Sequence, residues 1–272
     1  MTSANDRPEL LARLAEGIAD LTSSASWQHY LDVQGRFHRY SFKNALLITL
    51  QRQDATQVAG FNAWRKLDRT VRKGEKAIWV LAPMMYKKEN ADNGDDDRVV
   101  RGFKFVPVFD VAQTEGADLP SVCRRITGED TGGNFSKLLR VASSIGFRVE
   151  DHEFDGRTNG DCCHAECRIR VEANNSPAQR VKTLAHELAH ALLHETFESR
   201  ALAEMEAESI AYIICNGLGI DSGDYSFGYV ATWAGGGKQA IAGIEASCRR
   251  IQQTATTVLN ACETPQASRQ AA

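Results

Sequence analysis

The sequence has no apolar run near the roughly 20 residues that a membrane-spanning helix requires. Its first ten residues, MTSANDRPEL, lack the basic start and apolar stretch that are typical of a secretory signal. Glycine and proline number only 21 and 6 of 272 residues, which excludes a collagen-like chain. We therefore expect a globular, soluble and cytoplasmic protein that has no membrane partner.

Cysteine is also sparse and irregularly spaced. The seven cysteines are an odd, scattered set, which is not a disulfide framework. Cys162, Cys163, His164 and Cys167 have the residue types of a zinc site, but a structural zinc site needs a second ligand pair roughly 12–20 residues away. The next histidines downstream belong to a different motif, so we interpret these cysteines as reduced thiols in a hairpin.

The formal net charge of −3 hides an uneven distribution. Residues 33–88 contain 12 basic and 3 acidic side chains, whereas residues 126–272 have a net charge of −6. Aromatic residues are interleaved with the basic ones, most densely in residues 63–83. Proteins that bind single-stranded nucleic acids combine a cationic groove with rings on which bases stack. The block therefore favours binding to nucleic acid, with an ordinary solvated face as the alternative.

The candidate nucleic-acid contacts lie at the centre of this block. They are Phe61, Trp64, Arg65, Lys66, Arg69, Arg72, Lys73 and Lys76. No recognition helix, zinc finger or RNA-binding aromatic signature accompanies them in the sequence, so sequence-specific reading of duplex DNA is not expected.

Hydrophobic periodicity predicts an α+β fold with helices in both halves. In the first half the pattern predicts helices at 8–22, 27–37 and 42–50, a short helix around Trp64, and strands at 77–83 and 103–109. In the second half it predicts helices at 135–144, 177–195, 200–216, 226–234 and 237–260, and strands at 147–150 and 167–171.

A segment poor in apolar residues separates the two halves. Residues 121–134 are rich in glycine, serine and threonine, so we expect a linker there, between domains at 1–120 and 135–272. The first domain would combine helices with a small antiparallel sheet. The second would be mainly helical with a short sheet.

The sharpest signal is HELAH at residues 186–190, inside a helical pattern of apolar residues. Positions i and i+4 of a helix are stacked neighbours, so His186 and His190 can both bind one zinc ion. Glu187 projects beside the metal and can take a proton from the water activated there. These residues predict a zincin-like metallopeptidase site.

A third ligand must come from another element. Three histidines stacked on one helix cannot surround a tetrahedral ion, so we assign His194 to the helix surface or to a supporting role. The next predicted helix offers Glu204 and Glu208, which share a face, and Glu206, which suits a solvated acidic face. We favour Glu204 as the ligand and Glu208 as the residue that orients a ligating histidine, with the reverse assignment as the alternative.

Two His and one Glu leave one coordination position open, which is the catalytic rather than the structural arrangement. The implied chemistry is hydrolysis of an amide bond by a zinc metalloendopeptidase. An oxyanion partner is also expected. Tyr212 and Tyr229 are candidates for it, although a buried core position suits each tyrosine better.

With these motifs, the sequence resembles a known family over nearly its whole length. Four N-terminal motifs are similar to the single-stranded-DNA-binding domain of the plasmid antirestriction ArdC family and its LtrC-like relatives: YSFKNALLI (40–48), QDATQVAGFNAW (53–64), RTVRKGEKAIWVLAP (69–83) and VFDVAQTEG (108–116). Three C-terminal motifs are similar to the zinc metallopeptidase domain that this family shares with ImmA/IrrE proteins: VKTLAHELAHALLH (181–194), EMEAESIAYIIC (204–215) and YVATW (229–233).

The resemblance implies a protein of plasmids and other mobile elements that binds single-stranded DNA and protects incoming DNA from host restriction. It implies metal ligation by His186, His190 and Glu204, and catalysis by Glu187. Two features depart from the family: Glu206 stands where an apolar residue is usual, and DCCHAEC (161–167) stands where polar or small residues are usual.

Three functions follow as expectations. The first is an antirestriction protein whose zinc peptidase domain acts on a host defence or regulatory protein. The second is a DNA-binding accessory protein with a non-catalytic metal site. The third is a regulatory protease of the ImmA/IrrE type that cleaves a repressor.

Overall fold

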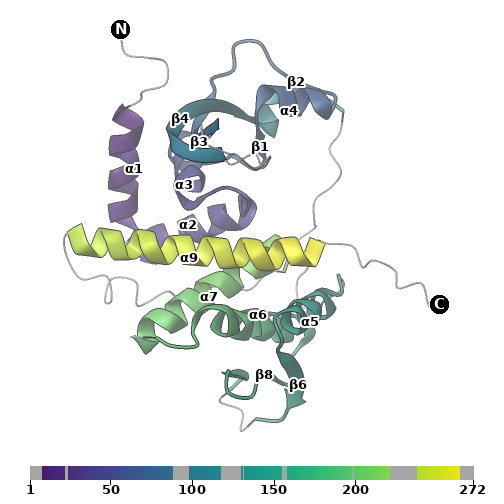
Figure 1. The fold of residues 1–272 in the computed structure, drawn as a ribbon. Coiled ribbons are helices and arrows are strands. Elements are labelled where there is room, and N and C mark those ends of the chain that lie inside the picture. The colour runs from purple at the N-terminus through teal and green to yellow at the C-terminus, as the bar shows by residue number, and fades with distance from the viewer. Residues whose placement is uncertain are drawn as a thin grey trace. The chain divides into compact units, whose positions relative to one another are not determined.

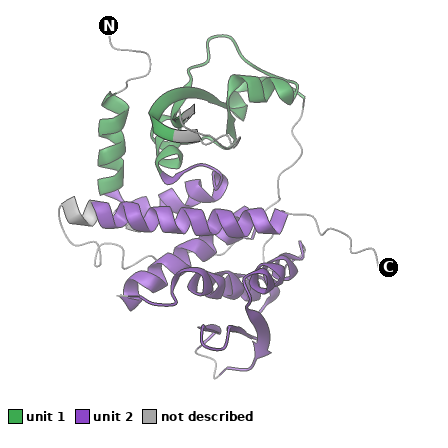
Figure 2. Cartoon of the chain, in the orientation of Figure 1, with its two compact units in different colours: residues 1–19, 43–120 green, residues 20–42, 121–272 purple. Residues whose placement is uncertain are grey.

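The computed structural model describes residues 8–21, 24–87, 98–117, 130, 132–154, 158–197, 199–220 and 238–263. The chain forms two compact units (Figure 2). Unit 1 comprises residues 1–19 and 43–120, and unit 2 comprises residues 20–42 and 121–272. Residues 20–42, which we expected in the first domain, therefore group with the second unit.

Unit 1 contains a twisted hairpin flanked by helices (Figure 1). The helices are α1 (Pro8–Asp20), α3 (Phe42–Gln51) and α4 (Phe61–Lys66). The strands β3 (Ile78–Lys87) and β4 (Arg98–Asp110) pair antiparallel, with Val80 opposite Val106. At the start of β3 alternate side chains point into the core, where Ile78 and Val80 are buried together with Val108 of β4.

Short strands complete unit 1. The strand β1 (Val58–Ala59) pairs with the end of β4, and β2 (Arg69–Val71) pairs with β5 (Thr114–Gly116), which follows the 3₁₀ turn η1 (Val111–Gln113). None of these short elements was predicted. A strand of two or three residues has too few positions for a period of two to be recognised, and its partner decides its conformation.

Two side-chain amides of α3 occupy the edge of β3. Asn44 donates to the Leu81 carbonyl and accepts from the Leu81 N–H, both at 2.8 Å. Gln51 does the same at Trp79, at 2.9 and 3.0 Å. These pairs satisfy backbone groups that an edge strand would otherwise leave to solvent or to another chain.

Unit 2 is mainly helical. Its helices are α2 (Ser24–Arg36), α5 (Asn134–Ser144), α6 (Pro177–Leu193), α7 (Arg200–Gly217) and α9 (Lys238–Glu263). The fully buried side chains include Leu184 and Leu188 of α6 and Ile210 and Ile213 of α7, which form the centre of the core. The indole of Trp27 in α2 donates to the Ser209 hydroxyl at 3.2 Å, which ties α2 to α7.

A three-stranded sheet lies beside α6. The order is β6 (Arg148–His152), β8 (Arg168–Glu172), β7 (Gly160–Cys163); β6 runs parallel to β8, and β7 runs antiparallel to it. The predicted hairpin at the cysteine cluster is confirmed, since β7 and β8 are joined by the turn at 164–167. The six cysteines in the described residues are all free.

The α+β class and the helices expected at 8–22, 27–37, 42–50, 177–195 and 200–216 are confirmed within a few residues. The helix expected at 226–234, Tyr229, the YVATW motif and most of the 121–134 linker lie outside the described residues. None of the helices in the described part of the chain combines the length and apolar character that crossing a bilayer demands.

Candidate metal centre and basic surface

The helix α6 stacks the two histidines of HELAH. Ser176 begins the helix by accepting from the Gln179 N–H at 3.3 Å, and Pro177 follows in the first turn, where its missing N–H costs nothing. The Nε2 atoms of His186 and His190, one turn apart, lie 3.1 Å from each other. Both imidazoles therefore present a nitrogen to one point.

Glu204 of α7 reaches the same point. Its Oε2 lies 3.4 Å from His186 Nε2 and 3.6 Å from His190 Nε2. These three residues form the one group within the described residues whose ligand atoms all lie within 4.8 Å of one another. The side chain of Glu204 is 47% exposed, so the group faces solvent on one side.

Glu208 contacts the Nδ1 side of the His186 imidazole, opposite to Nε2. Its Oε2 lies 3.0 Å from His186 Nδ1, and its Oε1 lies 3.3 Å from the ammonium of Lys182. A carboxylate only accepts hydrogen bonds, so His186 donates from Nδ1, and its Nε2 can bind a metal ion once the imidazole is neutral. The roles that we favoured for Glu204 and Glu208 suit this placement.

Charge at the site follows from these contacts. Burial alone lowers the pKa of His186, but the carboxylates of Glu204 and Glu208 outweigh it and raise the pKa to about 9. The imidazoles of His186 and His190, which face its carboxylate, hold the pKa of Glu204 well below its usual range. Without a metal, a proton on His186 supplies the positive charge that two facing nitrogens and a carboxylate require.

Glu187 is buried beside this point. Burial raises the pKa of its carboxyl to about 7, even though neighbouring His186 acts to lower it. The side chain lines a cavity of about 550 Å³ that also contains His186, His190 and Glu204. A cavity of about 270 Å³ adjoins Glu187 and is lined by Lys182 and Glu208 among others.

Gly160 in β7 makes room for Glu187, and the sequence alone did not point to it. A Cβ at this position would lie 3.1 Å from Glu187 Oε1, 2.9 Å from the Arg170 carbonyl and 2.6 Å from Thr183 Cγ2. No other residue type fits between β8 and α6 without a shift.

The expected solvated position of Glu206 is wrong, and so is the surface alternative for His194, which leaves the supporting role: their side chains are 3% and 5% exposed. His194 lies behind His190, and Glu206 pairs with His194 and with Arg250 of α9. Arg250 lies 44 residues beyond Glu206, so no local pattern indicates that the glutamate has a buried partner.

The remaining candidates from the sequence are Tyr212 and the cluster at residues 162–167. Tyr212 is buried and its hydroxyl donates to the Asp32 carboxylate, so it is a core tyrosine. Cys162 and His164 line the large cavity. Burial raises the pKa of Cys162 to about 12, which keeps its thiol protonated at neutral pH.

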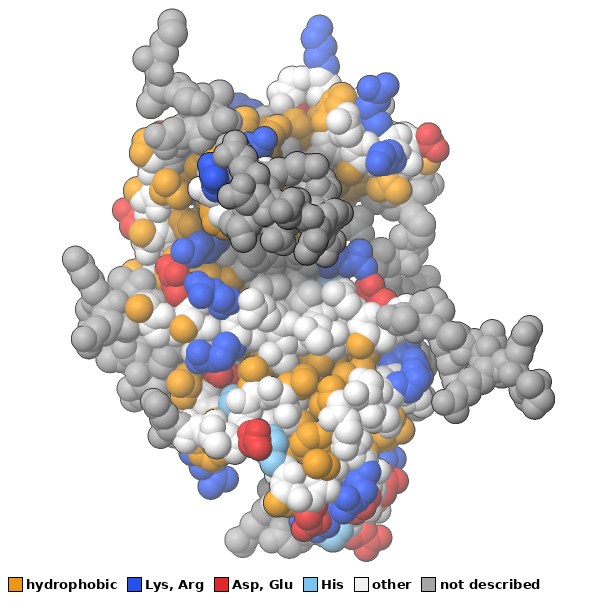
Figure 3. Space-filling view, viewed as in Figure 1, with side chains coloured by type: hydrophobic (Ala, Val, Ile, Leu, Met, Phe, Trp, Pro, Cys, Tyr) orange, Lys and Arg blue, Asp and Glu red, His pale blue; other side chains and the backbone are white. Residues whose placement is uncertain are grey.

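The basic surface of unit 1 divides into exposed and engaged residues. Trp64 is not available for stacking, because it is only 2% exposed and its indole donates to the Phe109 carbonyl at 2.8 Å. Phe61 is 45% exposed, and Arg65 and Lys66 follow it on the exposed side of α4. In Figure 3, basic and apolar side chains stand side by side over this part of the unit, at the upper right.

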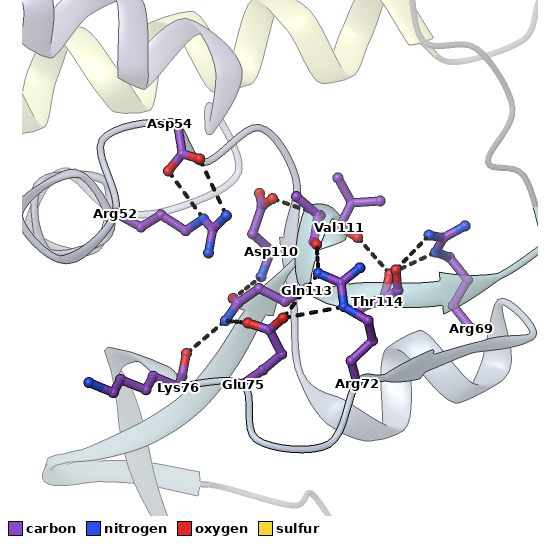
Figure 4. A network of polar contacts seen from close by, with 11 residues as sticks. Arg52, Asp54, Arg69, Arg72, Glu75, Lys76, Asp110, Val111, Gln113 and Thr114 are labelled. Carbon is purple, nitrogen blue, oxygen red and sulfur yellow. Dashed lines mark hydrogen bonds and ion pairs between the residues drawn. The ribbon is translucent and has the colours of Figure 1, made fainter.

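Two of the predicted arginines are held within unit 1 (Figure 4). Arg69 donates to the Thr114 hydroxyl at 2.8 Å and to backbone carbonyls. Arg72 pairs with Glu75 at 3.0 Å and donates to the Ala112 carbonyl. They fix the β2–β5 region, whereas Lys73 and Lys76 are exposed at the turn around Gly74, whose φ of 91° suits glycine.

Each half of this chain matches the model of a known domain. Residues 9–111 match the N-terminal domain of anti-restriction factor ArdC, and residues 147–215 match the IrrE N-terminal-like domain of the peptidase M78 model. The chain thus belongs to the class of proteins that join an ArdC-type N-terminal domain to an IrrE-like domain. In this pairing of domains the chain resembles the ArdC-like antirestriction family.

Individual relatives are distant. An uncharacterized protein of Bacillus anthracis is 26% identical, over 83% of this chain and 46% of that protein, so the chain spans about half the length of the curated relative that it matches. The fold is similar to the metal-free crystal structure of the antirestriction protein ArdC from plasmid R388, with a TM-score of 0.50, 20% identity and 81% of each chain covered. The Mn(II)-bound structure of the same protein gives 0.49, with 19% identity and 81% and 82% covered.

Proposed function

We propose that this protein is an antirestriction protein of mobile elements that binds single-stranded DNA with unit 1 and hydrolyses peptide bonds at a zinc ion in unit 2. The observation that carries the proposal is the convergence of His186, His190 and Glu204 beside buried Glu187. The two family matches support the pairing of these activities in one chain.

The donor set fits zinc. Two imidazole nitrogens and one carboxylate, with one side of the group facing solvent, match the ligands of catalytic zinc sites. The hydrogen bond from His186 Nδ1 to Glu208 directs Nε2 toward the shared point, where a metal ion would displace the proton that the metal-free imidazole carries. Zinc in such a site polarises a carbonyl and lowers the pKa of a water toward roughly 7.

Glu187 would move the proton. Its carboxylate lies in the large cavity, with a pKa of about 7 in the metal-free protein, close to the value that suits a general base at neutral pH. In the proposed reaction Glu187 accepts a proton from the attacking water and returns it to the leaving amine. His186, His190 and Glu204 would hold the ion.

Single-stranded DNA would contact the exposed part of the basic surface: Phe61, Arg65, Lys66, Lys73 and Lys76. Phe61 and Arg65 are i and i+4 on α4 and share one face, so a base and a phosphate can be contacted together. Arg69 and Arg72 support this surface through Thr114 and Glu75, with any remaining donor of each guanidinium left for a phosphate.

Two variants separate the proposal from its alternatives in an assay that scores transfer of unmodified plasmid DNA into a restricting host. We expect Glu187→Gln to lose protection while it retains zinc and DNA binding. Full protection by Glu187→Gln would favour an accessory protein with a non-catalytic metal site. Full protection by Arg65→Glu/Lys66→Glu, with DNA affinity lost, would favour a regulatory protease.

A further inference from the structure

A chain of buried polar contacts leads from His190 to the C-terminal helix. His190 Nδ1 lies 3.0 Å from His194 Nδ1, and His194 Nε2 lies 3.3 Å from Glu206 Oε2. Glu206 is held by the Arg250 guanidinium, whose Nε lies 3.1 Å from Oε1 and whose Nη2 also contacts that oxygen. The contacts join α6, α7 and α9 within unit 2.

Because His194 and Glu206 are buried, losing one of these contacts would leave a polar group without a partner. The side chains of His194 and Glu206 are 5% and 3% exposed, so neither can exchange its partner for water at low cost. Arg250 is 43% exposed and donates also to the Ser247 hydroxyl at 3.1 Å, so its charge reaches solvent while its donors face inward.

The directions of these hydrogen bonds can be assigned by starting from the contact between Arg250 and Glu206. Glu206 beside Arg250 is an acceptor, so His194 carries its hydrogen on Nε2. In a neutral His194 imidazole Nδ1 then accepts, which makes His190 Nδ1 the donor. His190 Nε2 is left with its lone pair toward His186 and Glu204, and Glu208 likewise directs Nε2 of His186 to the same point.

We infer that His194, supported by Glu206 and Arg250, is a positioning residue that orients His190 for the metal ion. This inference rests on the proposed metal centre. Each ligating imidazole is then held at Nδ1 by a different partner: Glu208 for His186, and the His194–Glu206–Arg250 chain for His190. Such supporting contacts typically change metal affinity by about 10–100-fold.

Two substitutions of His194 separate positioning from packing. An asparagine places an amide group near the position of His Nδ1, so His194→Asn can still accept from His190. A glutamine places its amide near Nε2, so His194→Gln can still donate to Glu206 but leaves His190 Nδ1 without its acceptor. The probe is Zn²⁺ alone, titrated in competition with a chromophoric chelator, and the Co²⁺ absorption spectrum reports the ligand geometry.

We expect His194→Gln to bind Zn²⁺ about 10–100-fold more weakly than wild type, with a changed Co²⁺ spectrum. His194→Asn should retain most of the affinity. Arg250→Met should weaken binding, whereas Arg39→Met, which removes the ion pair between Arg39 and Glu263 at the end of α9, should not. Thermal unfolding of the metal-free variants shows whether each one is folded.

The outcomes are distinguishable. Equal zinc binding by wild type and His186→Ala would reject the proposed metal centre and, with it, this inference. Loss of zinc in His186→Ala together with wild-type affinity in His194→Gln would leave the metal centre standing and overturn the positioning role. Equal losses in His194→Asn and His194→Gln, with equally lowered unfolding temperatures, would show that His194 acts only in packing.

Discussion

At the scale of single residues, burial and neighbouring charges set the properties of the residues at the candidate metal centre. Glu187 has a pKa of about 7 because it is buried, and Gly160 leaves the space in which it lies. His186 has a pKa of about 9 because two carboxylates face it. The behaviour of each residue follows from its neighbours on other elements.

Gly160→Ala tests the packing around Glu187. The new methyl group would lie 2.6 Å from Thr183 Cγ2 and 2.9 Å from the Arg170 carbonyl, so β7 or α6 must shift. We expect the unfolding free energy to fall by about 1–3 kcal/mol. Gly60→Ala is the control, because a Cβ at Gly60 has nothing within 4 Å. Chemical denaturation measures both, and equal stability of the two variants would contradict this packing role.

Metal binding should depend on pH through His186. Its pKa in the metal-free protein is raised to about 9, so at neutral pH a metal ion must displace its proton. Zinc affinity should therefore rise with pH between about 6.5 and 8.5. The metal-free protein should behave in the opposite way: a raised histidine pKa contributes stability that is complete below about 6.5 and lost as pH rises through about 9.

Calorimetric zinc titrations in buffers of different ionisation enthalpy count the protons released at each pH. Unfolding curves of the metal-free protein provide the second readout. An affinity that stays constant across this range, with no proton release, would show that His186 is already neutral.

At the scale of secondary structure, periodicity predicted the long elements and missed what depends on distant partners. The helices α6 and α7 follow from apolar spacing, as does the sharing of one face by Glu204 and Glu208. The burial of Glu206 depends on Arg250 in α9, and the burial of Trp64 depends on the Phe109 carbonyl in β4. Neither partner lies close enough in sequence to be recognised.

The helix α4 allows the two aromatic residues to be separated by experiment. Phe61→Ala should weaken binding of single-stranded DNA by about 1–3 kcal/mol, the usual effect of removing one base-stacking ring. Trp64→Phe should leave DNA affinity unchanged and lower stability by about 1 kcal/mol, because the hydrogen bond to the Phe109 carbonyl is removed. Fluorescence anisotropy and thermal unfolding measure the two effects, and the reverse pattern would restore Trp64 as the DNA-stacking residue.

At the scale of the whole molecule, charge divides along the sequence. Residues 33–88 carry 12 basic and 3 acidic side chains, while residues 126–272 have a net charge of −6 and include the glutamates at the candidate metal site. Part of the first group, including Arg36 and Arg39, belongs to unit 2, so the candidate DNA surface is smaller than the sequence block suggested. Its exposed cations are Arg65 and Lys66 on α4, and Lys73 and Lys76 at the turn around Gly74.

This division makes the salt dependence of DNA binding a test of the surface. Affinity for single-stranded DNA should fall steeply with salt, because neutralising each phosphate releases counterions. Lys73→Gln/Lys76→Gln should weaken binding and reduce the slope by about 0.7 for each phosphate that is no longer neutralised. Arg13→Gln/Lys43→Gln removes two other cations and serves as the control. An unchanged slope in the Lys73/Lys76 variant would place the phosphates elsewhere.

The proposed mechanism depends above all on His186, His190 and Glu204 holding one zinc ion. The most direct measurement is the zinc content of the purified full chain, after zinc loading and removal of excess metal. We expect about one zinc per chain in wild type and in Glu187→Gln, and none in His186→Ala or Glu204→Ala. Zinc retained in both of the latter variants would contradict this assignment and point instead to the cysteines at 162–167.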